Sequence, residues 1–230
     1  MRRASILLGM VVVTGGSAAA QQIRVDSLAA AYWQAELDRN PEAATVNGFP
    51  GPRNGRLTDL APAAFDAYDA RLRSLQRSAA TIDSAGLTPL QIVTLRMLQE
   101  SLTRDLSTRV CRAELWAVNQ LDGPQVTLAD LAALQPTATR DDRALLLARW
   151  RRIGAYLDQH VMNLRAGLAA GYTAPRQNVE RVIGQLDQLL ATPVDQSPLL
   201  PAAARPGAPG RDDRWAGQAR AEVADVIIPS

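Results

Sequence analysis

The sequence predicts an all-α protein, an irregular helical bundle that contains a long antiparallel helical hairpin. Signals for helix starts and stops recur along the 230 residues, and apolar residues follow them at spacings of three and four. The alternating pattern typical of strands is nearly absent. Aromatic residues make up only 4% of the chain, and hydrophobic residues 47%, so we expect a core built mainly from Leu, Val, Ile and Ala.

The first twenty residues predict a secretory signal peptide rather than a part of the fold. A basic start is followed by the apolar run Ile6–Val13 and by small residues at Ser17–Ala20, which suit cleavage before Gln21. The apolar run is too short to span a bilayer. We therefore expect an exported protein, periplasmic or extracellular, without a stable membrane anchor.

The charge balance argues against a nucleic-acid partner. All basic residues are Arg, and cleavage would remove Arg2 and Arg3, which leaves 23 basic and 23 acidic side chains. Cys111 is the only cysteine, so the chain has no internal disulfide. An exported protein without disulfides depends on its core or on a partner for stability.

A helical domain is expected over residues 21–191, and its first half holds four helices. Their predicted first residues are Asp26 or Ser27, Pro41, Pro62 and Pro89. The last of these follows a capping box, formed by Thr88 and Gln91. Residues 47–56 hold three Gly, two Pro and two Asn, which predicts an irregular loop.

The second half of this domain predicts the hairpin. Thr127 and Asp130 have the spacing of a helix start, and Thr139 and Asp142 precede the longest predicted helix, which runs to about Ala169. Gly171 suits the end of that helix and Pro175 the start of its partner. Because the connection between them is short, the two helices are expected to be antiparallel.

The C-terminal part changes in composition. Residues 192–213 hold five Pro and predict a loop or linker with little to anchor it, followed by a terminal helix over 214–230. The chain stops directly after Val226, Ile227 and Ile228. This predicts a chain cut in mid-structure, with Val223, Val226 and Ile227 partly exposed, although a terminal turn docked on the core would give the same sequence.

The residues of this chain predict no catalytic, cofactor or metal site. His160 is the only histidine, and Leu164 stands where a second ligand on the same helical face would be. A zinc site usually needs three or four protein ligands, so His160 is interpreted as an ordinary helix residue. Nucleophile elbows, phosphate-binding Gly loops and dinucleotide motifs are absent from the sequence.

Two loops are candidates for facing a substrate. The stretch NQLDGPQ contributes five residues, and GYTAPR contributes a cation; these candidates are Asn119, Gln120, Asp122, Gly123, Gln125 and Arg176. Carboxamides both donate and accept hydrogen bonds, as a peptide backbone requires, and an Arg pairs with a carboxylate. The same residue types also form tight turns between helices, so both interpretations stay open.

Three stretches of the chain resemble the N-terminal part of the bacterial family known as domain of unknown function 885. They are AAYWQAELDRNPEAATVNGFPGPRNGRLTDLAPAA, ELWAVNQLDGPQVTLADLAALQP and YLDQHVMNLRAGLAAGYTAPRQNVERVIGQLDQLL. The resemblance implies an exported, mostly helical protein similar to zincin metallopeptidases. It also implies a zinc-binding HExxH helix downstream of the matched region, which this sequence does not contain.

Two hypotheses follow. In the first, the chain is the N-terminal helical portion of an exported zinc metallopeptidase-like protein, inactive alone, whose partners are a peptide substrate or a missing C-terminal half. In the alternative, it is a non-enzymatic exported helical module that binds a peptide or protein partner.

Overall fold

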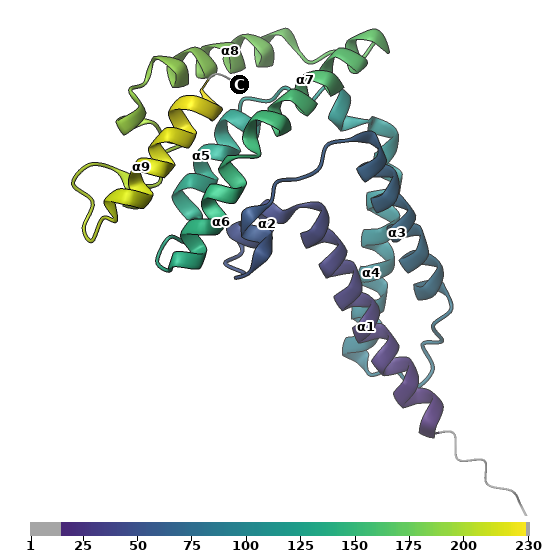
Figure 1. Ribbon diagram of the computed structural model, residues 1–230. Coiled ribbons are helices and arrows are strands. Elements are labelled where there is room, and N and C mark those ends of the chain that lie inside the picture. Colours follow the sequence, from purple (N-terminus) through teal and green to yellow (C-terminus); the bar gives the residue numbers. More distant parts are fainter. Residues whose placement is uncertain (1–14, 229–230) are drawn as a thin grey trace, which may run out of the picture. The chain divides into compact units, whose positions relative to one another are not determined.

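The computed structural model describes residues 15–228, and these residues form helices and irregular segments without a strand (Figure 1). The predicted all-α class is confirmed. Contacts divide the chain into two compact units. The first holds the described residues up to Trp33 together with Arg71–Leu106, and the second holds Gln34–Ala70 and the chain from Ser107 onward.

The predicted signal peptide lies mostly outside the described residues, and so does its apolar run Ile6–Val13. The first described helix, α1, spans Gly15–Arg39 and therefore begins before the cleavage site expected at Gln21. The sequence motif for helix capping at Asp26 or Ser27 falls inside this helix rather than at its start.

The first unit packs parts of three helices, which are α1, α3 (Pro62–Ala80) and α4 (Pro89–Thr108). One residue from each helix, namely Val25, Leu72 and Leu102, is completely buried. The Tyr32 hydroxyl of α1 donates to the Asp105 carboxylate of α4 over 2.6 Å.

Helix α4 begins as the sequence predicts. The Thr88 hydroxyl accepts from the amide of Gln91, and the Gln91 side chain accepts from the amide of Thr88, each over 3.3 Å. These reciprocal bonds satisfy amides at the helix start that have no partner within the helix.

The second unit holds the remaining elements. In chain order they are α2 (Pro41–Val46), η1 (Pro52–Gly55), η2 (Arg109–Cys111), η3 (Ala113–Leu115), α5 (Pro124–Leu134), α6 (Arg140–Trp150), α7 (Ile153–Ala169), α8 (Arg176–Ala191), η4 (Val194–Gln196), η5 (Ala202–Ala204), α9 (Asp213–Ala221) and η6 (Glu222–Ile227). Its main core joins α5, α6, the first turn of α7, the Pro-rich stretch, α9 and η6.

The expectation that residues 192–213 have little to anchor them is wrong. Leu199 and Leu200 are 2% and 1% exposed and belong to the main core. The indole N–H of Trp150 donates to the Leu199 carbonyl over 3.1 Å inside that core. Proline limits regular structure but does not prevent burial, because its ring is apolar and its fixed φ lowers the entropy lost on folding.

The expected exposure of the terminal segment is also wrong. Val223 is fully buried and Ile227 is 6% exposed, while the side chain of Val226 lies outside the description. Helix α9 continues directly into η6, a stretch of wider π-helical turns, and both contribute to the main core. The segment is therefore an integral part of this unit.

The single long helix predicted from Thr139 to Ala169 is divided in two. Its capping box at Thr139 and Asp142 is present, but α6 ends at Trp150 and α7 begins at Ile153. Trp150 and Ile153 are both completely buried and so is Arg149, which faces a polar surrounding. We attribute the break to these different anchors, because one straight helix buries only one face.

Arg149 connects the loop at residues 47–56 to α6 by hydrogen bonds. Its guanidinium donates to the carbonyls of Arg53 (2.9 Å) and Arg56 (2.8 Å), to the Thr45 hydroxyl (2.8 Å) and to the Gln135 side chain (2.6 Å). Burial lowers the pKa of Arg149 to about 10, which still leaves it charged at neutral pH. None of the four acceptors is a carboxylate, so dipoles supply the hydrogen bonds of this charge, and the charge of Glu42 adds to its stabilisation.

Candidate functional site

The stretch NQLDGPQ forms a tight turn that leads into α5. The Asn119 carboxamide oxygen accepts from the Leu121 amide over 2.8 Å, and the Asn119 carbonyl accepts from the Gly123 amide over 3.1 Å. Helix α5 begins at Pro124, with Gly123 as its capping position. The predicted start at Thr127 is therefore wrong, because proline at a first helical position begins the helix one turn earlier.

Carboxamides hold this turn against α8. The Gln125 side-chain N–H₂ donates to the Asn119 carbonyl (3.0 Å) and to the Gln185 side chain (2.9 Å). Gln185 in turn donates to the Gln120 carbonyl over 3.0 Å. The partner Gln185 was missed in the sequence, because it lies 60 residues from Gln125 and its helical pattern resembles that of any polar surface position.

A cavity of about 520 Å³ lies beside this turn, and polar side chains share its lining with Leu60, Ala113, Ala117, Val118 and Pro124. It is called the polar cavity here because its charged groups distinguish it from the neighbouring cavity. Three of the predicted residues line it, namely Asn119, Asp122 and Gly123. No local pattern in the sequence marks the other polar side chains of the lining as site residues. They are Glu42, Thr58, Trp116, Thr127, Tyr156, His160 and Asn178, with Asn40 at the start of α2. These side chains come from six separate segments, so only the tertiary structure brings them together.

An apolar cavity of about 350 Å³ also borders the turn. Helices α7 and α8 supply about half of its lining, and their apolar residues there are Leu157, Val161, Leu164, Val182, Leu186, Leu189 and Leu190. Its polar side chains are the predicted Asn119 and Gln125, with His160. Five residues line both cavities, namely Ala117, Val118, Asn119, Pro124 and His160.

His160 lies between the two cavities and contacts Tyr156. Its Nε2 lies 3.2 Å from the Tyr156 hydroxyl oxygen, and the two rings pack edge to face at 4.9 Å. Burial lowers the pKa of His160. The imidazole is thus neutral at pH 7 and offers one donor and one acceptor. Burial, and next the charge of Glu42, raise the pKa of Tyr156, whose hydroxyl stays protonated.

Glu42 is the acidic group held in a fixed position in the polar cavity. Its carboxylate accepts from the Thr58 amide over 2.8 Å and from the Thr58 hydroxyl over 2.7 Å. A carboxylate has about four acceptor positions, so these two bonds leave capacity for a ligand. Asp122, the other acidic residue of the lining, is exposed.

The remaining predicted residues lie outside both linings. The Arg176 side chain is 90% exposed and pairs with Glu180 one turn further along α8 over 2.7 Å. Gln120 takes part through its backbone carbonyl. The structure therefore brings together Asn119, Asp122, Gly123 and Gln125, and it places Arg176 elsewhere.

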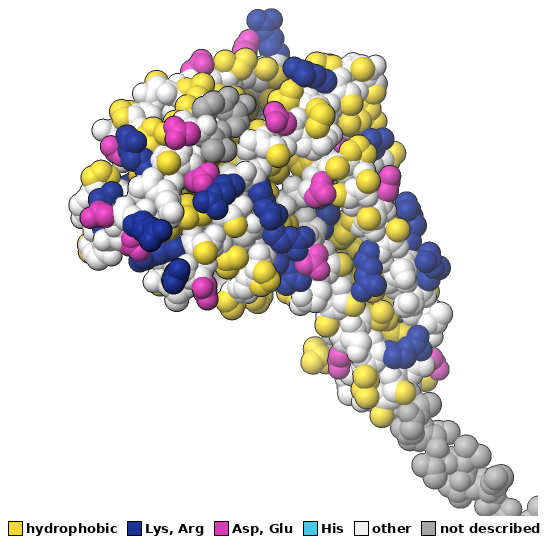
Figure 2. All heavy atoms as spheres, viewed as in Figure 1, with side chains coloured by type: hydrophobic (Ala, Val, Ile, Leu, Met, Phe, Trp, Pro, Cys, Tyr) yellow, Lys and Arg dark blue, Asp and Glu magenta, His cyan; other side chains and the backbone are white. Residues whose placement is uncertain are grey.

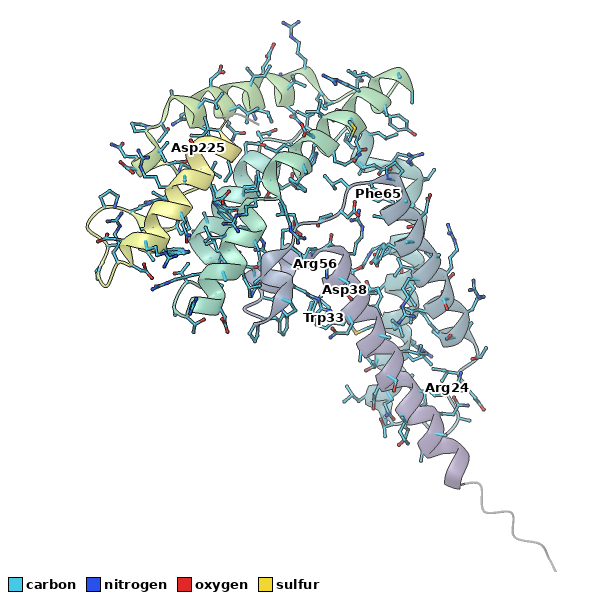
Figure 3. The ribbon with its side chains drawn as sticks, viewed as in Figure 1. Arg24, Trp33, Asp38, Arg56, Phe65 and Asp225 are labelled. Carbon is cyan, nitrogen blue, oxygen red and sulfur yellow. The ribbon has the colours of Figure 1, made fainter. Side chains whose placement is uncertain are left out.

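A third cavity, of about 330 Å³, has Phe65 in its lining. Figure 3 labels Phe65. The guanidinium groups of Arg39 and Arg109 lie over the Phe65 ring at 4.2 and 4.6 Å. Arg109 also pairs with Asp69 and Glu114, each over 3.2 Å. Such mutual pairing satisfies the charges within the cluster and identifies it as a structural ion-pair network.

Across the surface, basic and acidic side chains are interspersed, as Figure 2 shows for one face. Within residues 15–228, no group of three or more His, Cys, Asp and Glu side chains has an arrangement that suits a metal ion. Over the same range, no helix has the length and apolar character needed to cross a membrane.

Comparison with known proteins gives matches of two kinds. A solved structure described as "the putative lipoprotein from Colwellia psychrerythraea" aligns with a TM-score of 0.70 at 15% sequence identity. The alignment covers 90% of this chain and 39% of that one, so this chain spans about two fifths of the length of the solved protein. At this identity the match shows a shared fold. No curated protein matches the chain.

The second match is to a family of sequences. The model of the family described as "Bacterial protein of unknown function (DUF885)" matches residues 41–230, which include α2 and all later elements. All residues that line the two cavities beside the NQLDGPQ turn lie within this range, except Asn40. The chain therefore belongs to the DUF885 family of bacterial proteins.

Proposed function

We propose that this chain is the N-terminal helical portion of an exported metallopeptidase-like protein and that its two adjoining cavities bind a peptide. The observation that supports peptide binding is the shared wall of the cavities. A polar and an apolar cavity meet at Asn119 and His160, so a ligand there meets hydrogen-bonding groups and an apolar surface at the same time. A peptide offers this combination at every residue.

The residues of the polar cavity supply the groups that a peptide backbone needs. The neutral His160 and the Tyr156 hydroxyl both donate and accept, and the Asn178 carboxamide does the same. The bonds of Gln185 with Gln125 and with the Gln120 carbonyl hold the turn in place, which lowers the entropy lost when a ligand binds. In this proposal these side chains bind and orient the peptide.

The zinc ion that the family resemblance implies does not fit the residues of this chain. No suitable cluster of ligands exists among residues 15–228, and the sequence holds one His and one Cys. We therefore assign no catalytic step to these residues. The length of the solved protein, of which 39% aligns, supports placing the chemistry in another part of a longer protein.

The test of peptide binding uses a mixed peptide pool. A digest of a denatured, unrelated protein is passed over the immobilised chain, and retained peptides are identified by mass spectrometry. Leu186→Trp, which fills the apolar cavity, is expected to reduce retention at least tenfold. The matched variant Ile183→Trp, on the same helix but outside the lining, keeps it. Equal retention by the two variants, or none by the wild type, would refute the proposal.

Two further measurements test the remaining parts. If the chain is exported, mass spectrometry of the mature protein will find Gln21 at the N-terminus, and an intact Met1 on protein isolated from the periplasm or medium argues against cleavage. The chain alone is expected to bind no stoichiometric zinc and to leave the retained peptides uncut. A tightly bound zinc after dialysis would contradict the assignment of chemistry to another part.

A further inference from the structure

The charge of the polar cavity distinguishes which part of a peptide it accepts. The charged residues of its lining are Glu42 and Asp122, and both are acidic. His160 does not offset them, because burial keeps its imidazole neutral at pH 7. The cavity is therefore suited to a positively charged group.

The nearby cations are engaged elsewhere. The Arg39 guanidinium donates to the Asp59 carbonyl over 2.7 Å and lies over the Phe65 ring. The charge of Glu42 also acts on Arg149, but the hydrogen bonds of Arg149 go to the Thr45 hydroxyl, the carbonyls of Arg53 and Arg56, and Gln135. Neither Arg39 nor Arg149 lines the polar cavity, so the Glu42 carboxylate keeps acceptor capacity on the side of the cavity.

The apolar cavity defines the second group of the ligand. Its volume of about 350 Å³ lies near the lower end of the range of volumes of ligand pockets. A cavity of this size suits one large aliphatic or aromatic side chain. The N–H₂ group of Gln125 is occupied by its bonds to Asn119 and Gln185. The other polar side chains of this cavity, Asn119 and His160, belong to the wall shared with the polar cavity. Leu186 and Val161 are 42% and 43% exposed, which leaves the cavity open to an entering side chain.

We infer that the two cavities together recognise the N-terminus of a peptide whose first side chain is large and apolar. In such a residue the ammonium group and the side chain are attached to the same carbon atom. The polar and the apolar cavity share a wall at Asn119 and His160, so one residue can reach both. The ammonium group pairs with Glu42 in the polar cavity, and the side chain fills the space between α7 and α8. This inference rests on the proposed peptide binding and adds the class of peptide.

The test compares four tripeptides that separate the free N-terminus, the first side chain and an internal positive charge. They are Leu-Gly-Gly, its N-acetylated form, Gly-Gly-Gly and N-acetyl-Leu-Lys-Gly. Binding is measured by calorimetry and by the fluorescence of Trp116, which lines the polar cavity and is 39% exposed. Leu-Gly-Gly is expected to bind at least tenfold more tightly than each of the other three.

Variants assign the two parts of this preference. Glu42→Gln keeps an acceptor for the Thr58 amide but removes the charge, so it is expected to reduce the preference for the free over the acetylated peptide at least fivefold. Glu180→Gln, on the exposed face of α8, is the matched control and keeps the preference. Leu186→Trp is expected to abolish the advantage of Leu-Gly-Gly over Gly-Gly-Gly, whereas Ile183→Trp retains it.

The outcomes separate this inference from the function on which it rests. If acetylated and free peptides bind equally, or if the internal lysine replaces the free N-terminus, the inference is refuted while peptide binding stands. Equal binding of Gly-Gly-Gly refutes the role of the apolar cavity in the same way. If no peptide from either experiment binds, both the inference and the proposed function are wrong.

Discussion

Replacing Arg149 by Met tests whether this one side chain holds the loop at residues 47–56 in place. Met occupies a similar volume to the aliphatic stem but removes four hydrogen bonds. The bonds to Thr45 and Gln135 are buried, and a bond to a charged group in such surroundings contributes about 1.5–3 kcal/mol. The bonds to the carbonyls of Arg53 and Arg56 are part-buried, and water can replace them.

The expected loss follows from these contributions. The two buried bonds together contribute about 3–6 kcal/mol, and removing a buried charge returns some of its desolvation cost. We therefore expect Arg149→Met to lower the free energy of unfolding by about 3–5 kcal/mol. Arg149→Lys, which keeps the charge but reaches fewer acceptors, is expected to give an intermediate loss.

Urea unfolding followed by tryptophan fluorescence measures this loss, because Trp150 and Trp215 lie in the core of the same unit. Arg165→Met on the exposed face of α7 is the control and is expected to change stability by less than about 0.5 kcal/mol. Amide exchange at residues 47–56 is expected to become faster in Arg149→Met. A loss below about 1 kcal/mol, with unchanged exchange in the loop, would refute this account of Arg149.

Three further predictions concern packing and pH. A methyl group at Gly167 would lie 2.7 Å from the carbonyl carbon of Leu115, so Gly167→Ala is expected to lower the free energy of unfolding by about 1–3 kcal/mol. Gly184 lies in open space on α8, so Gly184→Ala is expected to raise the free energy of unfolding by about 0.5–1 kcal/mol. Thermal unfolding that ranks the two variants alike contradicts this. Leu200→Ala in the Pro-rich stretch is expected to lower the free energy of unfolding in urea by about 2–5 kcal/mol. Leu121→Ala, at a residue that is 75% exposed, is expected to lower it by less than about 0.5 kcal/mol. Equal effects of the two variants would contradict the burial of Leu200 in the core. Burial lowers the pKa of His160 in the folded state, so the unfolded chain binds a proton at His160 first as the pH falls. The stability of the wild type relative to His160→Gln is therefore expected to fall as the pH drops below about 6.5. Parallel stability curves of the two proteins from pH 7.5 to 5 would show that the pKa of His160 does not change on folding.

Local signals in the sequence determined the class of the protein and the starts of several helices. The prolines at positions 41, 62 and 89 and the capping boxes at Thr88 and Thr139 act within one helical turn, so their effect does not depend on the rest of the fold. The NQLDGPQ turn was also found from composition. Gly, Pro, Asn and Asp have the same conformational preferences in any protein.

Only the tertiary structure decided how the candidate site is assembled and what is buried. Glu42, Gln185 and His160 are far apart in the sequence, and a single acid, carboxamide or imidazole on a helix carries no local sign of a cavity. The break between α6 and α7 arises because Arg149 and Trp150 are anchored in different surroundings. The burial of Leu200 and Val223 follows from long-range packing, because proline content and position near a terminus predict little about which side chains a core will cover.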